Sequence, residues 1–261
     1  MKRTRITPDL AQFPEEFHTF LRNYPVFDSS CSKEARVWFL DRDGGLFLKS
    51  APKGTLKTEA DMNAFFHSNG LGPEVLSYQS GESDWLLTRR IPGEDCIFPV
   101  YLANPKRLCD TIAILLRQLH ETDATHCPVT DRNERYLALA TKNYHLGKFD
   151  KDLFSGHWGF GSAQEAWKEI ERNGNYLKPD ALLHGDYCLP NILLDNWKFT
   201  GFIDLGSGGI GDRHIDLFWG VWTLFFNLKT NEYYDRFLDA YGRDKIIPEK
   251  LRTIAAFEVF G

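Results

Sequence analysis

Apolar residues fall into two kinds of pattern along the chain. Runs of strand length occupy residues 35–40, 46–49, 74–78 and 84–90, and a glycine-containing turn at 41–45 predicts a hairpin between the first two. Apolar residues at helical spacing occupy residues 13–21, 55–68, 107–120, 163–171 and 217–226. The pattern therefore predicts strands in the first third of the chain and helices in most of the remainder.

A separate pattern lies between residues 182 and 206, where short apolar runs surround polar loops. The first loop carries Asp186 and Asn191, and after a tight turn at 195–198 a further apolar run ends at Asp204. We expect three oxygen-bearing side chains at strand ends. In phosphoryl transfer one carboxylate accepts the proton of a hydroxyl, while an amide oxygen and a second carboxylate hold Mg²⁺ against nucleotide phosphates. The alternative is that Asp186 and Asn191 only pin the loop through bonds to its backbone.

Composition and charge exclude several classes of protein. The chain has 261 residues, of which 43% are hydrophobic, enough for one large domain or two lobes. Because 36 acidic residues outnumber 31 basic ones, we expect no nucleic-acid partner. No apolar run approaches the ~18 residues of a membrane span, so we expect no membrane partner. The five cysteines form no C-x-x-C pair and the basic start lacks a following apolar region, which predicts a cytoplasmic protein with reduced thiols.

The spacing of the polar residues carries a family resemblance. Asp186 and Asn191 stand in the D-x-x-x-x-N spacing of a kinase catalytic loop. They belong to the string His184-Gly185-Asp186 … Asn191-Ile192 … Gly201-Phe202-Ile203-Asp204-Leu205-Gly206 … Asp212 … Asp216. This string resembles the aminoglycoside phosphotransferase and choline kinase family, most closely the aminoglycoside 3′-phosphotransferases. The resemblance implies an α+β, bilobal, protein-kinase-like fold: a lobe of antiparallel sheet and helix over 1–93, a hinge near 88–93, and a larger, mainly helical lobe over 94–261.

The same resemblance assigns a nucleotide site. ATP, with GTP as an alternative, and Mg²⁺ are the implied cofactors, and Asn191 and Asp204 are the implied metal ligands. Lys49 would contact the α- and β-phosphates while Glu59 holds it in position; the alternative for Lys49 alone is a solvated strand end. Further implied contacts are Ser32 on the phosphates, Phe47 stacked on the base, and the backbone of Arg89 and Ile91 on the purine edge. An ordinary turn serine and a core aromatic are the alternatives for Ser32 and Phe47.

The implied substrate contacts are Glu258, near the C-terminus, and Asp212. The chain departs from the family where substrate ammonium groups are usually bound, because it has Trp222, Phe226 and Asn227 in place of an Arg and acidic residues. Of the family's acidic loop, only Asp150 and Asp152 stand near the expected place. Because carboxylates are the main contacts of a polycation, this leaves another small alcohol open as the substrate.

The helix predicted at 217–226 raises two further points. We interpret its aromatic residues as core, with an apolar wall of the substrate site as the alternative. We interpret Asp216 as the N-cap of this helix and, by resemblance, as a brace for the catalytic loop.

Three hypotheses for function follow. The first is an ATP-dependent O-phosphotransferase that moves the γ-phosphate to a hydroxyl of a cationic aminoglycoside, by resemblance the 3′-hydroxyl, with Asp186 as the base, and so gives antibiotic resistance. The second is a kinase for another small alcohol or amino-alcohol. The third is a non-catalytic nucleotide-binding module on the same fold. The set Lys49, Glu59, Asp186, Asn191 and Asp204 is intact, which argues against the third.

Overall fold

The computed structural model describes residues 3–31, 33–151 and 158–261, and they form two compact units. The first unit comprises Met1–Asp95 with Leu193–Gly206, and the second comprises Cys96–Ile192 with Ser207–Gly261. The stretch at 193–206, which the sequence prediction assigns to the C-terminal lobe, joins the first unit because its strands pair with Glu94 and Asp95.

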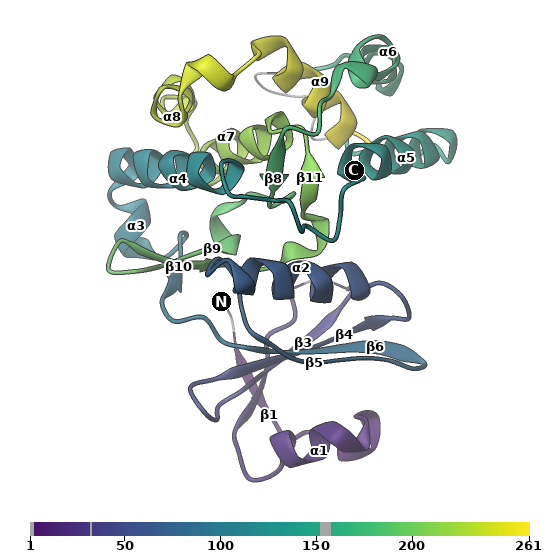
Figure 1. The fold of residues 1–261 in the computed structure, drawn as a ribbon, viewed down its shortest axis with the longest axis vertical. Helices are drawn as coiled ribbons and strands as arrows, with labels where there is room; N and C mark the ends of the chain where they lie inside the picture. Colours follow the sequence, from purple (N-terminus) through teal and green to yellow (C-terminus); the bar gives the residue numbers. More distant parts are fainter. Residues whose placement is uncertain (1–2, 32, 152–157) are drawn as a thin grey trace. The chain divides into compact units, whose positions relative to one another are not determined.

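An antiparallel sheet forms the first unit, with the strand order β1-β2-β3-β4-β6-β5 among the described residues (Figure 1). Its strands are β1 Thr4–Ile6, β2 Val26–Asp28, β3 Arg36–Leu40, β4 Leu46–Pro52, β5 Val75–Ser80 and β6 Ser83–Arg89. The predicted hairpin is confirmed as β3 and β4, in which Trp38 pairs with Leu48. The sequence pattern does not predict β1 and β2, because three residues are too few to show an apolar period.

Helices cover both faces of this sheet (Figure 1). The helices of the unit are η1 Leu10–Gln12, α1 Glu15–Leu21 and α2 Lys57–Ser68. Leu48 of β4 packs with Phe17 of α1, whereas Ala51 packs with Ala60 of α2. Because side chains alternate along a strand, Lys49 shares the face of Ala51. The sheet therefore presents Lys49 on the same side as α2.

A second, smaller sheet of this unit leads the chain to Asp204. It has the order β10-β9-β7 and consists of β7 Glu94–Asp95, β9 Ile192–Asp195 and β10 Lys198–Phe202. Asn196 and Trp197, between β9 and β10, have φ of 49° and 68°. Two successive left-handed residues are the geometry of a type I′ hairpin turn. This confirms the predicted turn at 195–198.

The second unit is mainly helical. Its longer helices are α3 Pro99–Leu102, α4 Pro105–His120, α5 Arg132–His145, α6 Ala163–Asn173, α7 His214–Leu228, α8 Tyr234–Tyr241 and α9 Pro248–Glu258. Short 3₁₀ turns lie at η3 Gly174–Tyr176, η4 Leu189–Asn191, η5 Leu205–Ser207 and η6 Arg243–Lys245, of which η5 begins in the first unit. A two-stranded sheet pairs β8 Ala181–Leu183 with β11 Gly209–Gly211.

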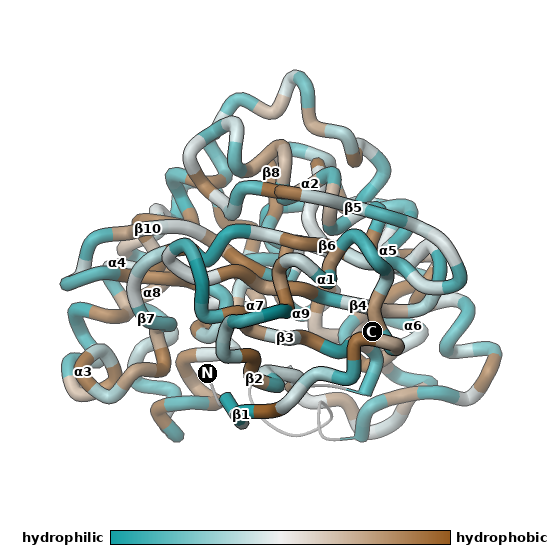
Figure 2. The backbone as a smooth tube through the Cα atoms, turned by 90° about the horizontal axis from the view of Figure 1, so that it is seen from below, coloured by the Kyte–Doolittle hydropathy of each residue, from teal (hydrophilic) through white to brown (hydrophobic). Residues whose placement is uncertain are grey.

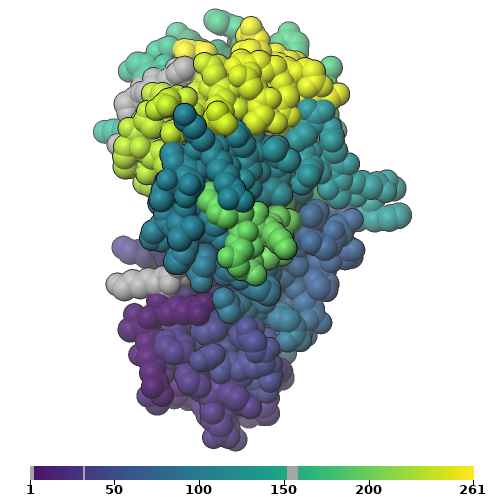
Figure 3. All heavy atoms as spheres, turned by 90° about the vertical axis from the view of Figure 1, so that its left-hand side faces the viewer, coloured from purple at the N-terminus to yellow at the C-terminus, as the bar shows by residue number. Residues whose placement is uncertain are grey.

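Apolar residues of α4, α7 and β8 form the core of this unit. Leu108, Ile112 and Leu116 of α4 are fully buried, as is Leu183 of β8. Figure 2 shows brown, hydrophobic stretches alternating with teal, hydrophilic ones along the chain, and Figure 3 shows α8 in yellow-green beside α4 in teal. The α4 helix thereby confirms the prediction made at 107–120.

Helix α7 differs from its prediction in two ways. It begins at His214, so Asp216 lies inside the first turn and the predicted N-cap role is wrong. The predicted core role of its aromatic residues is also wrong in part, since Phe225 and Phe226 are 41% and 50% exposed.

In the described part of the chain, every helix is too short or too polar to cross a membrane.

Candidate active site

Lys49 lies at the centre of an ion cluster in the first unit. Its ammonium nitrogen is 2.9 and 2.7 Å from the two carboxylate oxygens of Glu59, and 3.0 Å from Oδ1 of Asp204. Strand β4 supplies the lysine, α2 supplies the glutamate, and the segment after β10 supplies the aspartate. The Lys–Glu pair therefore forms as the resemblance implies, and Asp204 adds a second anion to it.

Opposing effects set the charges of this cluster. Burial alone would lower the pKa of Lys49, but the carboxylates of Glu59 and Asp204 outweigh it, so the pKa is raised and the ammonium is retained. Burial raises the pKa of Glu59, and the charge of Lys49 partly counters that rise. Asp204 has φ of 62°, in the left-handed region that costs a non-glycine residue about 1 kcal/mol or more. Its side chain is 54% exposed, so the strained backbone presents a carboxylate to solvent.

The other predicted nucleotide contacts are Ser32, Phe47 and the backbone of Arg89 and Ile91. Ser32 lies outside the described residues. Phe47 is half-buried and packs against Phe39, with ring centroids 5.2 Å apart. The backbone N–H of Arg89 donates to the carbonyl of Glu74 at 2.9 Å, so this donor is already used. The roles of Phe47 and Ile91 toward a base stay predictions.

The loop between β8 and β9 carries Asp186 and Asn191 in the second unit. The side-chain amide of Asn191 donates to the backbone carbonyl of Asp186 at 3.0 Å and to its Oδ2 at 2.9 Å. Asp186 is half-buried and Asn191 is buried. Gly185 has φ of 84°, and a Cβ there would lie 1.9 Å from the carbonyl oxygen of Ser207. Only glycine fits this position, and its lack of a side chain lets the loop pack closely against the backbone of Ser207.

Asp216 holds the start of this loop. Its fully buried carboxylate accepts hydrogen bonds from the backbone N–H groups of His184 and Gly185, each at 2.7 Å. The predicted brace for the catalytic loop is therefore present, although its carboxylate caps the loop and not the helix.

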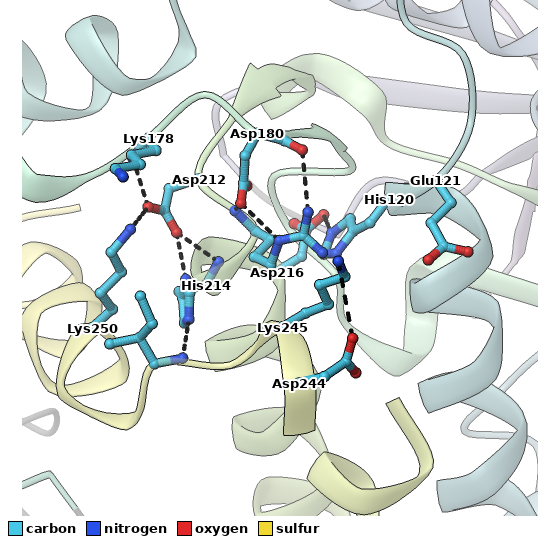
Figure 4. Close-up of polar contacts among 12 residues, drawn as sticks. His120, Glu121, Lys178, Asp180, Asp212, His214, Asp216, Asp244, Lys245 and Lys250 are labelled. Carbon is cyan, nitrogen blue, oxygen red and sulfur yellow. Dashed lines mark hydrogen bonds and ion pairs between the residues drawn. The ribbon is translucent and has the colours of Figure 1, made fainter. Parts of the chain in front are cut away.

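A buried chain of side chains extends from Asp216 and begins with His120, and Figure 4 labels these two residues. His120 Nε2 lies 3.2 Å from the Asp216 carboxylate, and His120 Nδ1 lies 2.8 Å from the hydroxyl of Tyr241. Arg213 in turn donates to that hydroxyl at 3.0 Å. Burial lowers the pKa of His120, which keeps the ring neutral, with one nitrogen donating to the carboxylate and the other accepting from Tyr241. We name Asp216, His120, Tyr241 and Arg213 the loop brace.

Glu258, at the end of α9, occupies a buried site with two donors. The Tyr136 hydroxyl donates to its Oε1 at 2.5 Å, and the Trp219 indole N–H donates to the same oxygen at 3.1 Å. Burial raises the pKa of Glu258 to about 7 despite these donors, and the negative charge of Asp186 adds to the rise. Glu258 and Asp186 therefore interact electrostatically within the second unit.

Asp212 is fully buried in a separate ion cluster (Figure 4). Its carboxylate accepts from His214 Nδ1 at 2.6 Å, from the Lys250 ammonium at 2.5 Å and from the backbone N–H of Lys178 at 2.7 Å. Burial alone would raise its pKa, but these bonds lower it well below the ordinary value. The protein's own donors already bind this carboxylate, which argues against the predicted substrate contact at Asp212 and favours a structural role.

Comparisons with known proteins identify the family of the chain. The model of a family described as "Phosphotransferase enzyme family" matches residues 29–254. A probable aminoglycoside 3′-phosphotransferase of Lactococcus lactis subsp. lactis (strain IL1403) is 48% identical over 262 residues, covering 100% of this chain and 99% of the relative. The chain belongs to this phosphotransferase family. The resemblance to aminoglycoside 3′-phosphotransferases is thereby confirmed.

Solved structures of this family share the fold. An aminoglycoside 3′-phosphotransferase of type VIII matches with a TM-score of 0.72 at 25% identity, over 96% of each chain. An aminoglycoside phosphotransferase of Streptomyces rimosus in complex with ADP and streptomycin has a TM-score of 0.71 at 22% identity, over 97% of this chain and 100% of that one. The predicted α+β, protein-kinase-like fold is confirmed.

The phosphotransferase has oxygen ligands suited to Mg²⁺, which prefers carboxylate and carbonyl oxygens. Both hydrogen bonds from the Asn191 side chain to Asp186 use its nitrogen, so its Oδ1 does not bond Asp186. Asp204 is half-exposed, and its contact with Lys49 uses Oδ1. Among the described residues, no group of three or more His, Cys, Asp and Glu could hold a metal by itself. Asn191 in the second unit and Asp204 in the first unit each retain an oxygen of the kind that Mg²⁺ prefers.

Sequence reasoning missed several residues of this phosphotransferase's site. Nothing in the spacing of His120 marks it as part of the loop brace, because its partners stand about 100 residues away in sequence. Tyr136 and Trp219 likewise reach Glu258 only through tertiary packing. The one available signal was a polar residue at the end of the otherwise apolar pattern of α4.

Proposed function

We propose that the protein is an ATP-dependent O-phosphotransferase that moves the γ-phosphate of ATP to a hydroxyl of an aminoglycoside, the 3′-hydroxyl, and so gives antibiotic resistance. The observation that carries this proposal is the loop of Asp186 and Asn191, which Asp216 holds by two backbone N–H groups. The relative at 48% identity, named a probable aminoglycoside 3′-phosphotransferase, supports the substrate class.

In the proposed reaction Asp186 orients the acceptor hydroxyl and receives its proton. The oxygen–phosphorus bond to the acceptor forms as the bond between the γ-phosphorus and its bridging oxygen breaks, and ADP leaves. Asn191 fixes the Asp186 carboxylate through the 2.9 Å bond to its Oδ2, so the remaining oxygen faces the hydroxyl. Catalysis then consists mainly of positioning and charge neutralisation.

The nucleotide is assigned to ion-cluster residues of the first unit. Lys49, held by Glu59, would contact the α- and β-phosphates. Asp204 and Asn191 are the residues that would hold Mg²⁺, which when bound neutralises charge on the transferring phosphoryl group. Ser32, Phe47 and Ile91 are the further nucleotide contacts that the family resemblance implies.

Glu258 is proposed as the contact for a substrate ammonium group. Its side chain is buried, but the field of Asp186 acts on it, so a cation that binds near both carboxylates is stabilised by two negative charges. We propose that the enzyme works in the cytoplasm, where ATP is available, as the absence of a C-x-x-C pair among its five cysteines also predicts.

A second candidate is a kinase for a less highly charged amino-alcohol. The observation that favours it is the exposed aromatic end of α7, where Phe226 is 50% exposed. The non-catalytic binding module remains a third hypothesis, and the intact ion cluster and catalytic loop argue against it.

The decisive experiment measures ADP release with MgATP across kanamycin-type aminoglycosides, choline and simple amino-alcohols, with Asp186→Ala as the control. Turnover on aminoglycosides bearing a 3′-hydroxyl, lost in Asp186→Ala, supports the first candidate. Turnover only on amino-alcohols supports the second. ATP binding with no turnover on any acceptor would support the third hypothesis, a non-catalytic nucleotide-binding module.

A further inference from the structure

Three aromatic side chains form a continuous series along one side of α7. The rings of Trp219 and Trp222 meet edge to face with centroids 5.3 Å apart, and those of Trp222 and Phe226 stack at 4.8 Å with an interplanar angle of 14°. Their spacing of three and four residues places them on one helical stripe. We name these three residues the aromatic ladder.

The ladder is separate from the core side of the same helix. Leu217, Phe218, Val221 and Leu224 of α7 are buried and supply the apolar packing of the second unit. Trp219 and Trp222 are half-buried, and exposure rises to 50% at Phe226. Large aromatic rings left in water gain binding free energy when a ligand covers them, at roughly 25 cal/mol per Å² of apolar area.

The inner end of the ladder is continuous with the proposed substrate site. Trp219 donates its indole N–H to Glu258 at 3.1 Å. On the adjacent stripe of α7, the hydroxyl of Thr223 accepts from the backbone N–H of Leu189, in the loop that carries Asp186. The ladder therefore starts beside the carboxylates and runs outward along α7.

The outer end of the ladder carries a positive charge. The ammonium of Lys229, the residue directly after α7, lies 4.2 Å from the ring centroid of Phe226. A cation over an aromatic face is attracted by the ring, and it repels any second cation brought to the same place. A substrate ammonium is thus favoured near Glu258 and disfavoured near Phe226.

We propose that the aromatic ladder is a specificity site that binds an uncharged sugar ring of the substrate through its C–H surface. The preferred substrates are then aminoglycosides whose amino groups are few and lie on the Glu258 side, with hydroxyls on the ring that contacts Trp222 and Phe226. This assignment rests on the proposed phosphotransferase function, since it concerns the substrate of the same site.

The test uses matched pairs of aminoglycosides in which one hydroxyl replaces one amino group, such as paromomycin and neomycin. In the unaltered enzyme, kcat/KM is higher for the hydroxyl-bearing member of at least one pair. Trp222→Ala and Phe226→Ala each raise KM for that member about tenfold, with little change in kcat, because uniform binding is lost. Trp222→Phe retains most of the affinity.

Phe225→Ala is the matched control, because Phe225 is a similarly exposed phenylalanine of the same helix outside the ladder. Its KM stays within about twofold of the unaltered enzyme. Equal losses in Phe225→Ala and Phe226→Ala overturn the proposal. Lys229→Gln raises kcat/KM for the amino-bearing member and so brings the kcat/KM values of the two aminoglycosides closer together. An unchanged ratio of these two values would also contradict the ladder proposal.

Calorimetric binding of the same pairs without ATP separates this inference from the proposed function. The unaltered protein could bind aminoglycosides without turning any of them over, and Phe226→Ala could lose that binding. This outcome would support the ladder proposal and refute the transfer reaction. If no ladder substitution changed kcat/KM for any aminoglycoside, the transfer reaction would be supported and the ladder proposal refuted.

Discussion

At the scale of single residues, Glu258 combines burial with a position near another carboxylate. Two donors, Tyr136 and Trp219, favour its charged form, yet burial and the charge of Asp186 raise its pKa to about 7. Since its ordinary pKa is 4.5, the folded state binds a proton more readily than the unfolded chain does. The contribution of Glu258 to stability is therefore largest below about pH 4.5 and falls as the pH rises through about 7.

Substrate affinity is expected to change with pH in the opposite direction. As Glu258 loses its proton between about pH 6 and 8, its carboxylate becomes available to a substrate ammonium, so KM for the cationic substrate falls as pH rises. Glu258→Gln removes this dependence and raises KM. The exposed Glu249 of the same helix provides the control, and Glu249→Gln keeps the normal profile. The same profile in Glu258→Gln would contradict the assignment.

Gly185 is a second residue whose identity depends on its surroundings, through its backbone conformation and a close contact. Gly185→Ala combines a positive φ of 84° with a Cβ placed 1.9 Å from the Ser207 carbonyl oxygen. We expect a loss of about 2 kcal/mol or more in the free energy of unfolding, together with loss of transfer, because the Asp186 loop must move.

Gly147→Ala measures the part of this destabilisation that comes from the positive φ alone. Gly147 has φ of 64° and nothing within 4 Å of an added Cβ, so only the conformational penalty of about 1 kcal/mol remains. Urea denaturation of both variants gives the comparison. Equal effects at the two glycines would show that the close approach to Ser207 is unimportant.

At the scale of secondary-structure elements, the loop brace ties three helices to the catalytic loop. His120 ends α4, Tyr241 ends α8, and Asp216 stands in the first turn of α7. Because the loop before Asp186 has its N–H groups fixed by Asp216, the packing of these helices determines where the base lies.

His120→Leu tests this brace. The substitution removes one hydrogen bond from the Tyr241 hydroxyl and one from Asp216 Oδ2. Arg213 and the backbone N–H of His184 still donate to these two groups, so we expect a loss of about 1–3 kcal/mol of stability. We also expect a lower kcat at a little-changed KM for ATP, because the loop of Asp186 loosens while Lys49 is untouched. The exposed His126 serves as control, and His126→Leu retains both properties. Normal kcat in stable His120→Leu protein would argue against the brace.

At the scale of the whole molecule, the functional residues are divided between the two compact units. The first contains Lys49, Glu59 and Asp204, and the second contains Asp186 and Asn191. A nucleotide that binds the folded protein and not the unfolded chain stabilises the folded protein by mass action.

We therefore expect MgADP at 100 times its Kd to add about 2.7 kcal/mol to stability, visible as a higher Tm. Chelation of the metal by EDTA reduces the shift if Mg²⁺ contributes to nucleotide binding as proposed, with Asp204 and Asn191 as its proposed ligands. Lys49→Ala reduces it further, whereas Asp186→Ala keeps it, since Asp186 is assigned to the acceptor. A full shift in Lys49→Ala would remove that lysine from the nucleotide site.

Local sequence accounts for much of the fold. The β3–β4 hairpin, α2, α4, α6 and the β9–β10 hairpin each follow from an apolar period of two or 3.6 residues and from turn residues. The three-residue strands β1 and β2 do not, because their pairing partners and not their own residues stabilise them.

The sequence by itself determined the family, the kinase-like fold and the spacing of Asp186, Asn191 and Asp204, because motif residues and apolar periods are local properties of the chain. Tertiary structure decided the rest. It buried Asp212 among His214 and Lys250, connected His120 to Asp216, and left Phe226 in solvent. These outcomes depend on contacts between residues distant in sequence, and on whether packing leaves a side chain buried or exposed. No local pattern encodes either one.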